Sequence, residues 1–452
     1  MIDTEALRKK IIDLAIQGKL TQQLPEDGNA EDLYAKAQEE KAKLIKAGKI
    51  KTEKLLPVIS NDEVPFDIPD NWKWVYCRDV MLFINGRAYK KEELLSNGRY
   101  PVLRVGNFFS NEQYYYSDLE LDEDKYCKNG DLLYAWSASF GPKIWCGEKV
   151  IFHYHIWKIN MLYPLNTKYI YYYLLADTNR IKDLSHGIGF VFVTKEFMER
   201  RLMPIPPLEE QERIVERIEE ACAQIDIIDA LQQRYESDRE ILKGKIIDAG
   251  ISGKLTEQLS EDGNADDLYA QIQEEKAKLI KEGKIKCEKP LPEITEDEIP
   301  FVIPNNWKWV RLGDVIRINS GTGLTSQQMG DGDIPVYGGN GVAGYHNESL
   351  VDEETIVIGR VGYYCGSVHV TPEKAWITDN AFITTYPKKY IDRDYLFLAL
   401  KNMNLGQNTN GAAQPVVSGK KIYPLLFALP PLAEQKRIAK KIDDLLNSGV
   451  FK

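Results

Sequence analysis

The chain repeats a long part of its own sequence. Residues 10–80 align without a gap on residues 245–315, and 51 of the 71 aligned positions are identical. A second match has a different offset, because PPLEEQERI from Pro206 returns as PPLAEQKRI from Pro430. The start of the chain therefore repeats the end of one internal segment, and the end of the chain repeats the beginning of that segment. The repeat is circularly arranged.

The segment that both chain ends match, residues 206–253, is predicted to form one long helix. Pro207 is tolerated in a first turn, and Gly250 and Gly253 mark the far end. A lone helix with an apolar stripe would leave the stripe in water, so this helix needs a partner helix. The stripe has the three-, four- and seven-residue spacings of a coiled coil and comprises Ile214, Ile218, Ala221, Ile225, Ile228, Tyr235, Leu242 and Ile246.

The two chain ends are the expected partner of this helix. Residues 430–452 match its first half and residues 1–18 match its second half, whereas the equivalents of residues 229–235 are missing. We therefore expect the ends to meet and to form a second, broken helix antiparallel to the first. The alternative is that the ends are unrelated amphipathic segments, each capping its own domain.

The rest of the chain is predicted to form two globular domains of mixed α and β structure. Short apolar runs between glycines, such as RYPVLRVGNFF, predict strands, and TKYIYYYLLADTNRIKDLS and DRDYLFLALKNM predict helices. The predicted fold is thus mixed α/β, with the domains separated by an antiparallel pair of long coiled-coil-like helices in a circular, pseudo-twofold repeat. The expected segments are part of the second helix (1–24), the first domain with its leading helix and linker (25–205), the central helix (206–259), the second domain with its leading helix and linker (260–429) and the start of the second helix (430–452).

Each domain is preceded by a short helix and a proline-punctuated linker. Residues 30–47 are predicted to form the first of these helices, with Asn29 as its N-cap and Gly48 at its end. Four tryptophans recur in both copies and are expected to dock the linker onto its domain: Trp72, Trp74, Trp307 and Trp309. Either a shared binding partner or a recent duplication would explain why exposed-looking residues are also identical, namely Gln38, Glu39, Lys41 and Lys43.

The composition favours a protein of the reducing cytoplasm. The six cysteines are scattered without a CxxC pair, which argues against a disulfide framework and a zinc site. The N-terminus is amphipathic and charged, unlike a signal peptide, and no apolar run approaches membrane-spanning length. The formal net charge is −10, but by count residues 75–205 carry +2 and residues 310–428 carry −1. The acidity therefore does not exclude nucleic acid at the two domains, although it argues against a generally basic coat.

Catalysis is not predicted for this chain. It contains no GxxxxGK[ST] phosphate loop and no NPPY- or DPPF-like tetrapeptide, which an adenine methyltransferase would need. His153 and His155 flank Tyr154 on one predicted strand face. Because a metal pair would need a third ligand, bonds to neighbouring groups or to DNA are the favoured interpretation of these histidines. No catalytic residue and no metal site are predicted.

Several motifs resemble the specificity (S) subunit of type I restriction-modification systems. They are IPDNWKWV and IPNNWKWV before the domains, the GNF and GDLL run, the IGRVG and WITDNAFI run, and PPLxEQxRI after each domain. The resemblance covers essentially the whole chain. It implies that the domains are target recognition domains, each reading one half of a bipartite, asymmetric site in double-stranded DNA. It also implies that the long helices space the domains and bind two modification (methyltransferase) subunits.

The same resemblance implies the other partners and the cofactors. Restriction subunits, which carry the translocase and nuclease, would join the full complex. S-adenosylmethionine, ATP and Mg would bind to the partner subunits and not to this chain. The chain departs from the family in its short C-terminal helix, which stops at Lys452 and puts the completion of one partner site in doubt. The alternatives are a two-domain scaffold for a ligand other than DNA and the specificity part of a fused-type restriction enzyme.

Candidate contact residues follow from side-chain chemistry, because base edges are read mainly by Arg, Asn, Gln, Lys and Ser. The DNA-binding candidates are Arg104, Asn107, Ser137, Ser139, Lys143 and Lys195 in the first domain and Asn340, Arg360, Tyr363, Asn380, Gln414 and Lys420 in the second. Arg360 has an equally favoured alternative, pairing with a carboxylate such as Asp352 or Asp379. The subunit-binding candidates are Ile214, Ile218, Ile225, Ile228, Leu242 and Ile246. Four tryptophans are expected in the core: Trp136, Trp145, Trp157 and Trp376.

Overall fold

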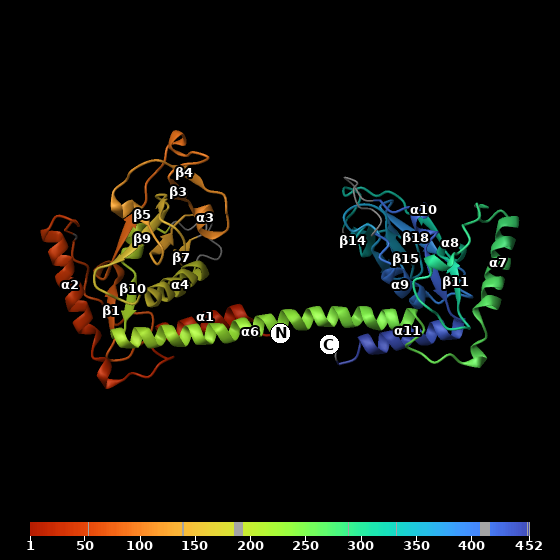
Figure 1. The fold of residues 1–452 in the computed structure, drawn as a ribbon, viewed down its shortest axis with the longest axis horizontal. Helices are drawn as coiled ribbons and strands as arrows, with labels where there is room; N and C mark the ends of the chain where they lie inside the picture. The colour runs from red at the N-terminus through yellow and green to blue at the C-terminus, as the bar shows by residue number, and fades with distance from the viewer. Residues whose placement is uncertain are drawn as a thin grey trace. The chain divides into compact units, whose positions relative to one another are not determined.

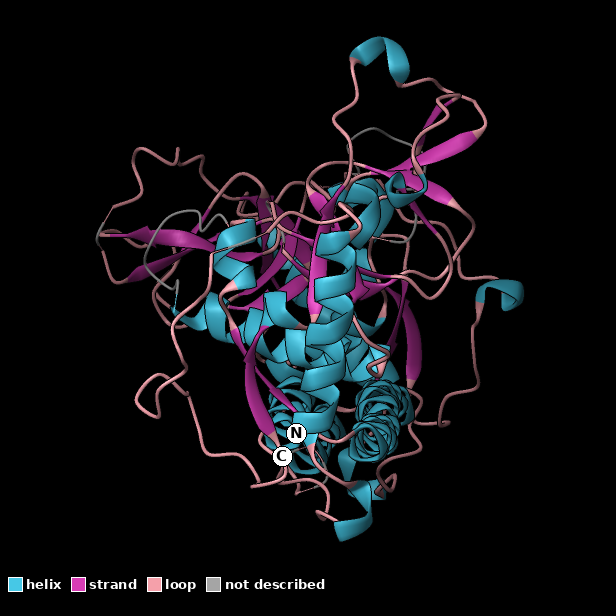
Figure 2. Ribbon diagram, turned by 90° about the vertical axis from the view of Figure 1, so that its left-hand side faces the viewer, coloured by secondary structure: helices cyan, strands magenta, loops and turns pink. Residues whose placement is uncertain are grey.

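The computed structural model describes residues 1–452 apart from 53, 138–139, 185–192, 288, 331, 407–415, 450 and 452. The chain divides into two compact units, unit 1 with residues 1–233 and unit 2 with residues 234–452. Each unit mixes helices and strands (Figure 1, Figure 2), as the sequence predicts.

Unit 1 contains three sheets and the helices that cover them. The sheets are ordered β2-β9-β6-β7, β4-β3-β8-β5 and β1-β10. The strands are β1 (Lys73–Tyr76), β2 (Met81–Asn85), β3 (Tyr100–Leu103), β4 (Tyr115–Ser117), β5 (Tyr126–Cys127), β6 (Leu132–Ala135), β7 (Gly141–Ile144), β8 (Val150–Phe152), β9 (Ile156–Met161) and β10 (Leu202–Ile205). The helices are α1 (Thr4–Ile16), α2 (Ala30–Lys46), α3 (Val105–Phe109), α4 (Thr167–Leu184), α5 (Lys195–Glu199) and the first part of α6 (Leu208–Ile251).

Unit 2 has sheets ordered β12-β18-β15-β16, β14-β13-β17 and β11-β19. The strands are β11 (Lys308–Arg311), β12 (Arg317–Ser320), β13 (Ile334–Gly338), β14 (Gly341–His346), β15 (Ile356–Gly359), β16 (Val368–Val370), β17 (Trp376–Ile377), β18 (Ala381–Thr385) and β19 (Leu426–Leu429). The helices are the second part of α6, α7 (Ala265–Lys281), α8 (Leu312–Val315), α9 (Arg393–Asn402), α10 (Gly419–Ile422) and α11 (Leu432–Leu446).

The two domains share one topology although their residues have diverged. β2, β9, β6 and β7 follow the same order as β12, β18, β15 and β16, and β4-β3-β8 corresponds to β14-β13-β17. The β3–β8 and β13–β17 pairs are both parallel. Both cores also bury a tyrosine of the helix after the sheets: Tyr169 of α4 and Tyr395 of α9 each donate a hydrogen bond to a strand carbonyl, at 2.7 and 2.8 Å. The duplication therefore extends through the domains.

The predicted long helix is present as α6, and each chain end packs on it. In unit 1, Thr4 bonds Asp229 at 2.5 Å and Arg8 pairs with Asp226 at 2.6 Å, so α1 runs antiparallel to α6 (Figure 1). The same helix also lies against its own domain, because Asp13 pairs with Arg180 of α4 at 3.0 Å. α1 therefore both partners α6 and caps the domain of unit 1.

In unit 2, α11 packs against the last turns of α6. A Cβ on Gly250 would lie 2.7 Å from Cδ1 of Ile442 and 3.0 Å from Cγ2 of Ile438. Gly250 therefore lies inside α6, and the close approach of α11, not the helix end, requires its glycine. Gly253, with a φ of +73°, does follow the helix end, in the left-handed conformation that favours glycine.

A buried glutamate joins a helix to the linker in each unit, on α6 in unit 1 and on α11 in unit 2. Glu210 is fully buried and accepts from the Trp72 indole at 2.8 Å, and Glu434 accepts from the Trp307 indole at the same distance. A threonine and a glutamine of the segment after α1 or α6 donate to the same carboxylates. Trp72 therefore anchors the linker to α6 and Trp307 anchors it to α11, which explains the repeated glutamate of the PPLxEQxRI motif.

Candidate nucleic-acid interface

A three-residue turn, residues 153–155, joins β8 to β9 and thereby links the two larger sheets of unit 1. Gly86, which follows β2, is pressed against it. A Cβ at position 86 would lie 2.3 Å from the Phe152 carbonyl oxygen and 2.4 Å from that of His153. The His153 amide donates to the Leu103 carbonyl of β3 at 2.9 Å. β2 and β3 therefore hold the turn from two directions, and position 86 requires glycine because no side chain fits there.

Trp136, the residue after β6, also holds this turn, through two hydrogen bonds. The Trp136 amide donates to the His155 carbonyl at 3.0 Å, and the Trp136 indole donates to the Tyr154 carbonyl at 2.8 Å. The Tyr154 side chain is 38% exposed. The turn thus has a fixed backbone and an exposed central side chain.

Unit 2 builds its corresponding turn, residues 378–380 between β17 and β18, in the same way. A Cβ on Gly321 would lie 2.3 Å from the Ile377 carbonyl oxygen and 2.5 Å from that of Thr378. The Thr378 amide donates to the Tyr337 carbonyl of β13 at 2.9 Å. The glycine, the two flanking strands and the turn therefore repeat the arrangement of unit 1.

Arg360, the residue after β15, holds the unit 2 turn as Trp136 holds the unit 1 turn. The Arg360 amide donates to the Asn380 carbonyl at 2.9 Å. The Arg360 guanidinium donates through Nη1 to the Asp379 carbonyl at 3.3 Å and to Ser320 Oγ at 3.1 Å. Asp379 and Asn380 are exposed. In both units the side chain after the strand bonds the carbonyl of the central turn residue.

The two domains therefore keep a common backbone frame and change the side chains on it. We call the four residues that this frame holds the turn set of each unit. They are Trp136, His153, Tyr154 and His155 in unit 1, and Arg360, Thr378, Asp379 and Asn380 in unit 2. A difference of side chains on a shared frame is what two recognition sites for unlike targets require.

The turn set of unit 1 is aromatic and uncharged near neutral pH. The ring centroid of His155 lies 3.9 Å from that of Tyr154 and 4.8 Å from those of His153 and Trp136. Burial, followed by the charges of His155 and Arg104, lowers the pKa of His153 to about 4. Burial and Arg104 also lower the pKa of His155. A histidine whose pKa lies below 6.5 is mainly neutral at pH 7. Its ring can then donate one hydrogen bond and accept another.

Of the predicted unit 1 candidates, Arg104 lies near this turn and Ser137 directly follows a residue that bonds it. Arg104 begins α3 and lies close enough to lower the pKa of both histidines, with its guanidinium 5.4 Å from the Tyr115 ring centroid. Ser137 follows Trp136 directly and is half-buried. Ser139 lies outside the described residues.

The other three unit 1 candidates bond within the protein. The Asn107 carboxamide donates to two backbone carbonyls of the turn after α3, at 3.1 and 2.7 Å. The Lys143 ammonium donates to the Phe108 carbonyl at 2.6 Å, and Lys195 pairs with Glu199 one helical turn away at 3.4 Å. The polar groups of Asn107 and Lys143 thus help to build the domain.

In unit 2, Arg360 and Asn380 come together in the turn set. Arg360 bonds the backbone carbonyl of Asp379, and within the described part of the chain it pairs with neither the Asp352 nor the Asp379 carboxylate. Tyr363 is 88% exposed in the segment after β15. Asn340 is exposed between β13 and β14, and Lys420 is exposed on α10, whereas Gln414 lies outside the described residues.

Sequence reasoning did not select the central turn residues, Tyr154 and Asp379. Their equivalence becomes visible only when β8 is matched to β17 and β9 to β18, because the sequences HYH and TDN share no residue. The glycines before them carried the available signal. Gly86 and Gly321 are separated by the same 235 residues as the long repeat but lie beyond its last aligned position.

The tryptophans predicted for the core divide into two groups. Trp145 and Trp157 are buried, as predicted. Trp136 and Trp376 are half-buried beside the turns, where Trp376 donates from its indole to the Thr322 carbonyl at 3.0 Å. Both therefore support the frame of the candidate interface and are not enclosed in the core.

The apolar stripe of α6 is only partly available to another subunit. Ile214, Ile218 and Ile225 are buried within unit 1, which corrects their prediction as subunit-binding residues. Ile228 and Ile246 are half-buried. Leu242 is 41% exposed, and three isoleucines and leucines outside the predicted set are more exposed still: Ile227, Leu231 and Ile241.

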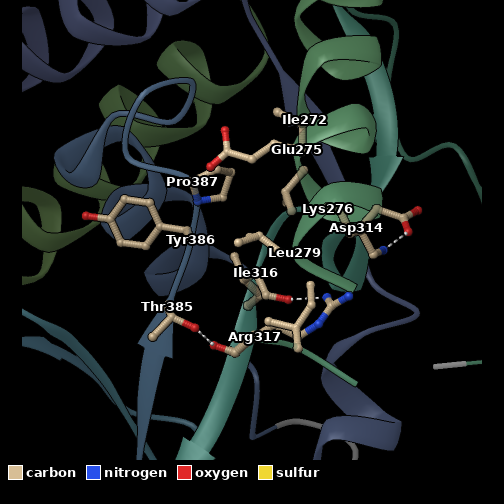
Figure 3. Close-up of a pocket in the computed structure, with 12 residues that line it drawn as sticks. Ile272, Glu275, Lys276, Leu279, Asp314, Ile316, Arg317, Thr385, Tyr386 and Pro387 are labelled. Atoms are coloured by element: carbon tan, nitrogen blue, oxygen red, sulfur yellow. Dashed lines mark hydrogen bonds and ion pairs between the residues drawn. The ribbon is translucent and has the colours of Figure 1, made fainter. Parts of the chain in front are cut away.

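A cavity of about 280 Å³ lies in unit 2 between α7 and the start of β12 (Figure 3). Beside it, Lys276 pairs with Asp314 at 3.0 Å, and the unit 1 equivalents, Lys41 and Asp79, are 3.3 Å apart. Gln38 also donates to the Asp79 carbonyl at 2.8 Å. The repeated identity of glutamine and lysine therefore docks each short helix onto its domain, and the cavity belongs to that joint.

Within the part of the chain that the structure describes, no group of three or more His, Cys, Asp or Glu side chains could hold a metal ion. None of the helices described there combines the length and the apolar character needed to cross a membrane.

Comparison with known proteins places this geometry in context. The model of the type I restriction modification DNA specificity domain matches residues 69–236 and 304–449. The specificity subunit of the type I restriction enzyme EcoAI from Escherichia coli is 26% identical, over 98% of this chain and 89% of that protein. The EcoEI specificity subunit from Escherichia coli is 28% identical, over 69% of this chain and 61% of that protein.

The fold has a counterpart among solved structures. A chain from work on the complex assembly and conformational transition of the type I R-M system superposes with a TM-score of 0.51 at 17% identity. The match covers 84% of this chain and 91% of that chain.

Proposed function

We propose that the two units each read one half of a bipartite, asymmetric DNA site. The chain belongs to the family of type I restriction-modification DNA specificity domains and is therefore a non-catalytic specificity subunit. The observation that supports this proposal most strongly is the pair of turn sets. They share a backbone frame and differ in every side chain, so the two units offer different chemistry to DNA. A site with two unlike halves follows from two unlike readers.

DNA contacts are proposed around each turn. In unit 1, Arg104 and Ser137 flank the turn set, and Arg104 supplies a positive charge beside two neutral histidines. In unit 2, Arg360 and Asn380 belong to the turn set and Tyr363 is exposed after it. Arginine can contact both phosphates and guanine, whereas the amides and rings suit base edges and stacking.

The long helices are proposed to space the half-sites and to bind two modification subunits. The exposed apolar side chains of α6, Ile227 and Leu231 in unit 1 and Ile241 and Leu242 in unit 2, are suited to packing against partner helices. Restriction subunits would complete the full complex. S-adenosylmethionine, ATP and Mg are assigned to these partners, since the methyl transfer and DNA cleavage are theirs.

Sequencing of methylated bases in the host genome tests this function. A split adenine-methylated motif should be present in cells that carry the gene and absent after its deletion. Restoring the gene with residues 75–204 exchanged for those of another family member should change only one half of the motif. Loss of the gene without loss of any motif, or a change in both halves, would contradict the proposal. Purified chain without partners should not transfer methyl groups to DNA.

A further inference from the structure

We propose that the turn set is the specificity-determining element of each unit, and that in unit 2 Arg360 selects a guanine and Asn380 an adenine in its half-site. The inference rests on the proposed DNA-reading function and deepens it by naming the residues and the bases. Its starting point is that the two frames share the glycine contact, the strand hydrogen bond to the first turn residue and the hydrogen bonds from the residue after the strand, while the four side chains of the turn set all differ.

Arg360 is preorganised for bidentate contact. Both bonds to described groups use Nη1, which donates to Ser320 Oγ and to the Asp379 carbonyl. The guanidinium also lies 5.6 Å from the Phe382 ring centroid. A guanidinium carries five N–H donors in a fixed fork. Among the described residues, no group accepts a hydrogen bond from Nε or Nη2 of Arg360, so this edge is available to a base. That edge matches the two acceptors O6 and N7 of guanine in the major groove.

Asn380 presents the complementary chemistry for adenine. Its backbone is fixed, because its amide donates to Thr378 Oγ1 at 3.3 Å and its carbonyl accepts from the Arg360 amide. The side chain is exposed. A carboxamide offers one donor and one acceptor to the N7 and N6 groups of adenine. The neighbouring Asp379 is exposed and acceptor-only, so it disfavours phosphate and favours a base-edge amino group.

Unit 1 should read its half-site without a charge on the turn. The Trp136 indole has one N–H, and that donor is used by the Tyr154 carbonyl. The remaining groups are the exposed Tyr154 ring and two histidines, which suit stacking, thymine methyl contact and neutral hydrogen bonds. The two half-sites should therefore differ in composition as the two turn sets do.

Two single substitutions in the complete complex test the assignment. Asn380→Ala should relax the adenine position and Arg360→Lys the guanine position, because lysine lacks the planar fork. Loss of a bidentate base contact should reduce discrimination at that position by roughly fivefold to 150-fold. The readouts are the methylated motif in cells and competition binding with DNA changed at one base pair. Glu373→Ala, an exposed change in unit 2 outside the turn set, is the matched control.

The first half-site serves as an internal control, because unit 1 is unaltered. The expected result is relaxation in the second half alone. An active complex with an unchanged second half-site would overturn the inference. Lost hydrogen-exchange protection of unit 2 in the variants would assign these residues to folding and would also overturn it. If the unaltered complex has no split motif at all, the proposed function itself fails, so the two failures can be distinguished.

A reciprocal exchange tests unit 1. The fourfold change Trp136→Arg, His153→Thr, Tyr154→Asp and His155→Asn places the unit 2 turn set on the unit 1 frame. Because the frame bonds are common to both units, we expect a folded complex whose first half-site changes while the second is retained. A first half-site that stays the same would contradict the role of the turn set.

Discussion

At the scale of single residues, the two buried glutamates are the main fixed points of the architecture. Glu210 and Glu434 are both fully buried, and each accepts hydrogen bonds from a tryptophan, a threonine and a glutamine. One turn further along α6, Arg213 pairs with Asp27, which follows α1 in the chain, and this ion pair lowers the pKa of the Asp27 carboxyl. A buried acceptor with several donors is costly to remove, because its donors are left without partners.

We predict that Glu210→Ala destabilises unit 1 and that Glu434→Ala destabilises unit 2. Each unpaired buried group costs about 1–3 kcal/mol, so a loss of about 3 kcal/mol in the free energy of unfolding is expected. Denaturant unfolding gives the magnitude, and amide hydrogen exchange shows which unit opens. The control is Glu209→Ala, because Glu209 is the exposed neighbour. Equal effects of Glu209→Ala and Glu210→Ala would show that the buried network is unimportant.

At the scale of elements, two glycines in α6 have opposite surroundings. A Cβ on Gly250 would meet the side chains of Ile438 and Ile442 on α11, whereas a Cβ on Gly244 would meet no atom within 4 Å. A glycine inside a helix costs about 0.8–1.0 kcal/mol relative to alanine. Gly244 thus only weakens the helix, whereas Gly250 permits the close contact of two helices.

We predict that Gly250→Leu displaces α11 and lowers the stability of unit 2 by 1–3 kcal/mol, the usual range for overpacking a close contact. Gly244→Ala, the matched change in the same helix, should raise stability by about 0.5–1 kcal/mol. Thermal unfolding and hydrogen exchange of α11 measure both effects. Tolerance of leucine at position 250 with α11 still protected would contradict the close packing that the structure describes.

At the scale of the whole molecule, α6 is shared by both units. It is 44 residues long, and the boundary between the units falls within it, after Gln233. The helix is therefore proposed to set the distance between the two half-sites. A change at the boundary alters the helix length without touching the sheets of either unit.

Inserting four residues after Gln233 should lengthen the spacer between the half-sites by one or two base pairs. The insertion adds roughly 6 Å of helix, and four residues are close to one turn of 3.6, so the apolar stripe stays nearly in register. DNA rises about 3.4 Å per base pair. The methylated motif should keep both half-sequences. The same insertion after the exposed Val58 of the linker is the control and should leave the spacer unchanged. An unchanged spacer in an active variant with the α6 insertion would exclude the helix as the ruler.

The repeat, the long helix, the N-capped short helices, the linkers and the family could be predicted from the sequence alone, because these features depend on neighbours along the chain or on copied segments. Asn29 caps α2 as predicted, and α6 begins and ends within two residues of the predicted range 206–253, although it stops short of residue 259, the limit of the predicted central segment. Only the tertiary structure decided the turn sets and the burial of Ile214, Ile218 and Ile225. Each turn set joins a residue after one strand to a turn between two others, and each buried isoleucine is covered by segments distant in sequence. Sheet pairing and helix packing make these contacts, and local periodicity contains no information about which distant surfaces will meet.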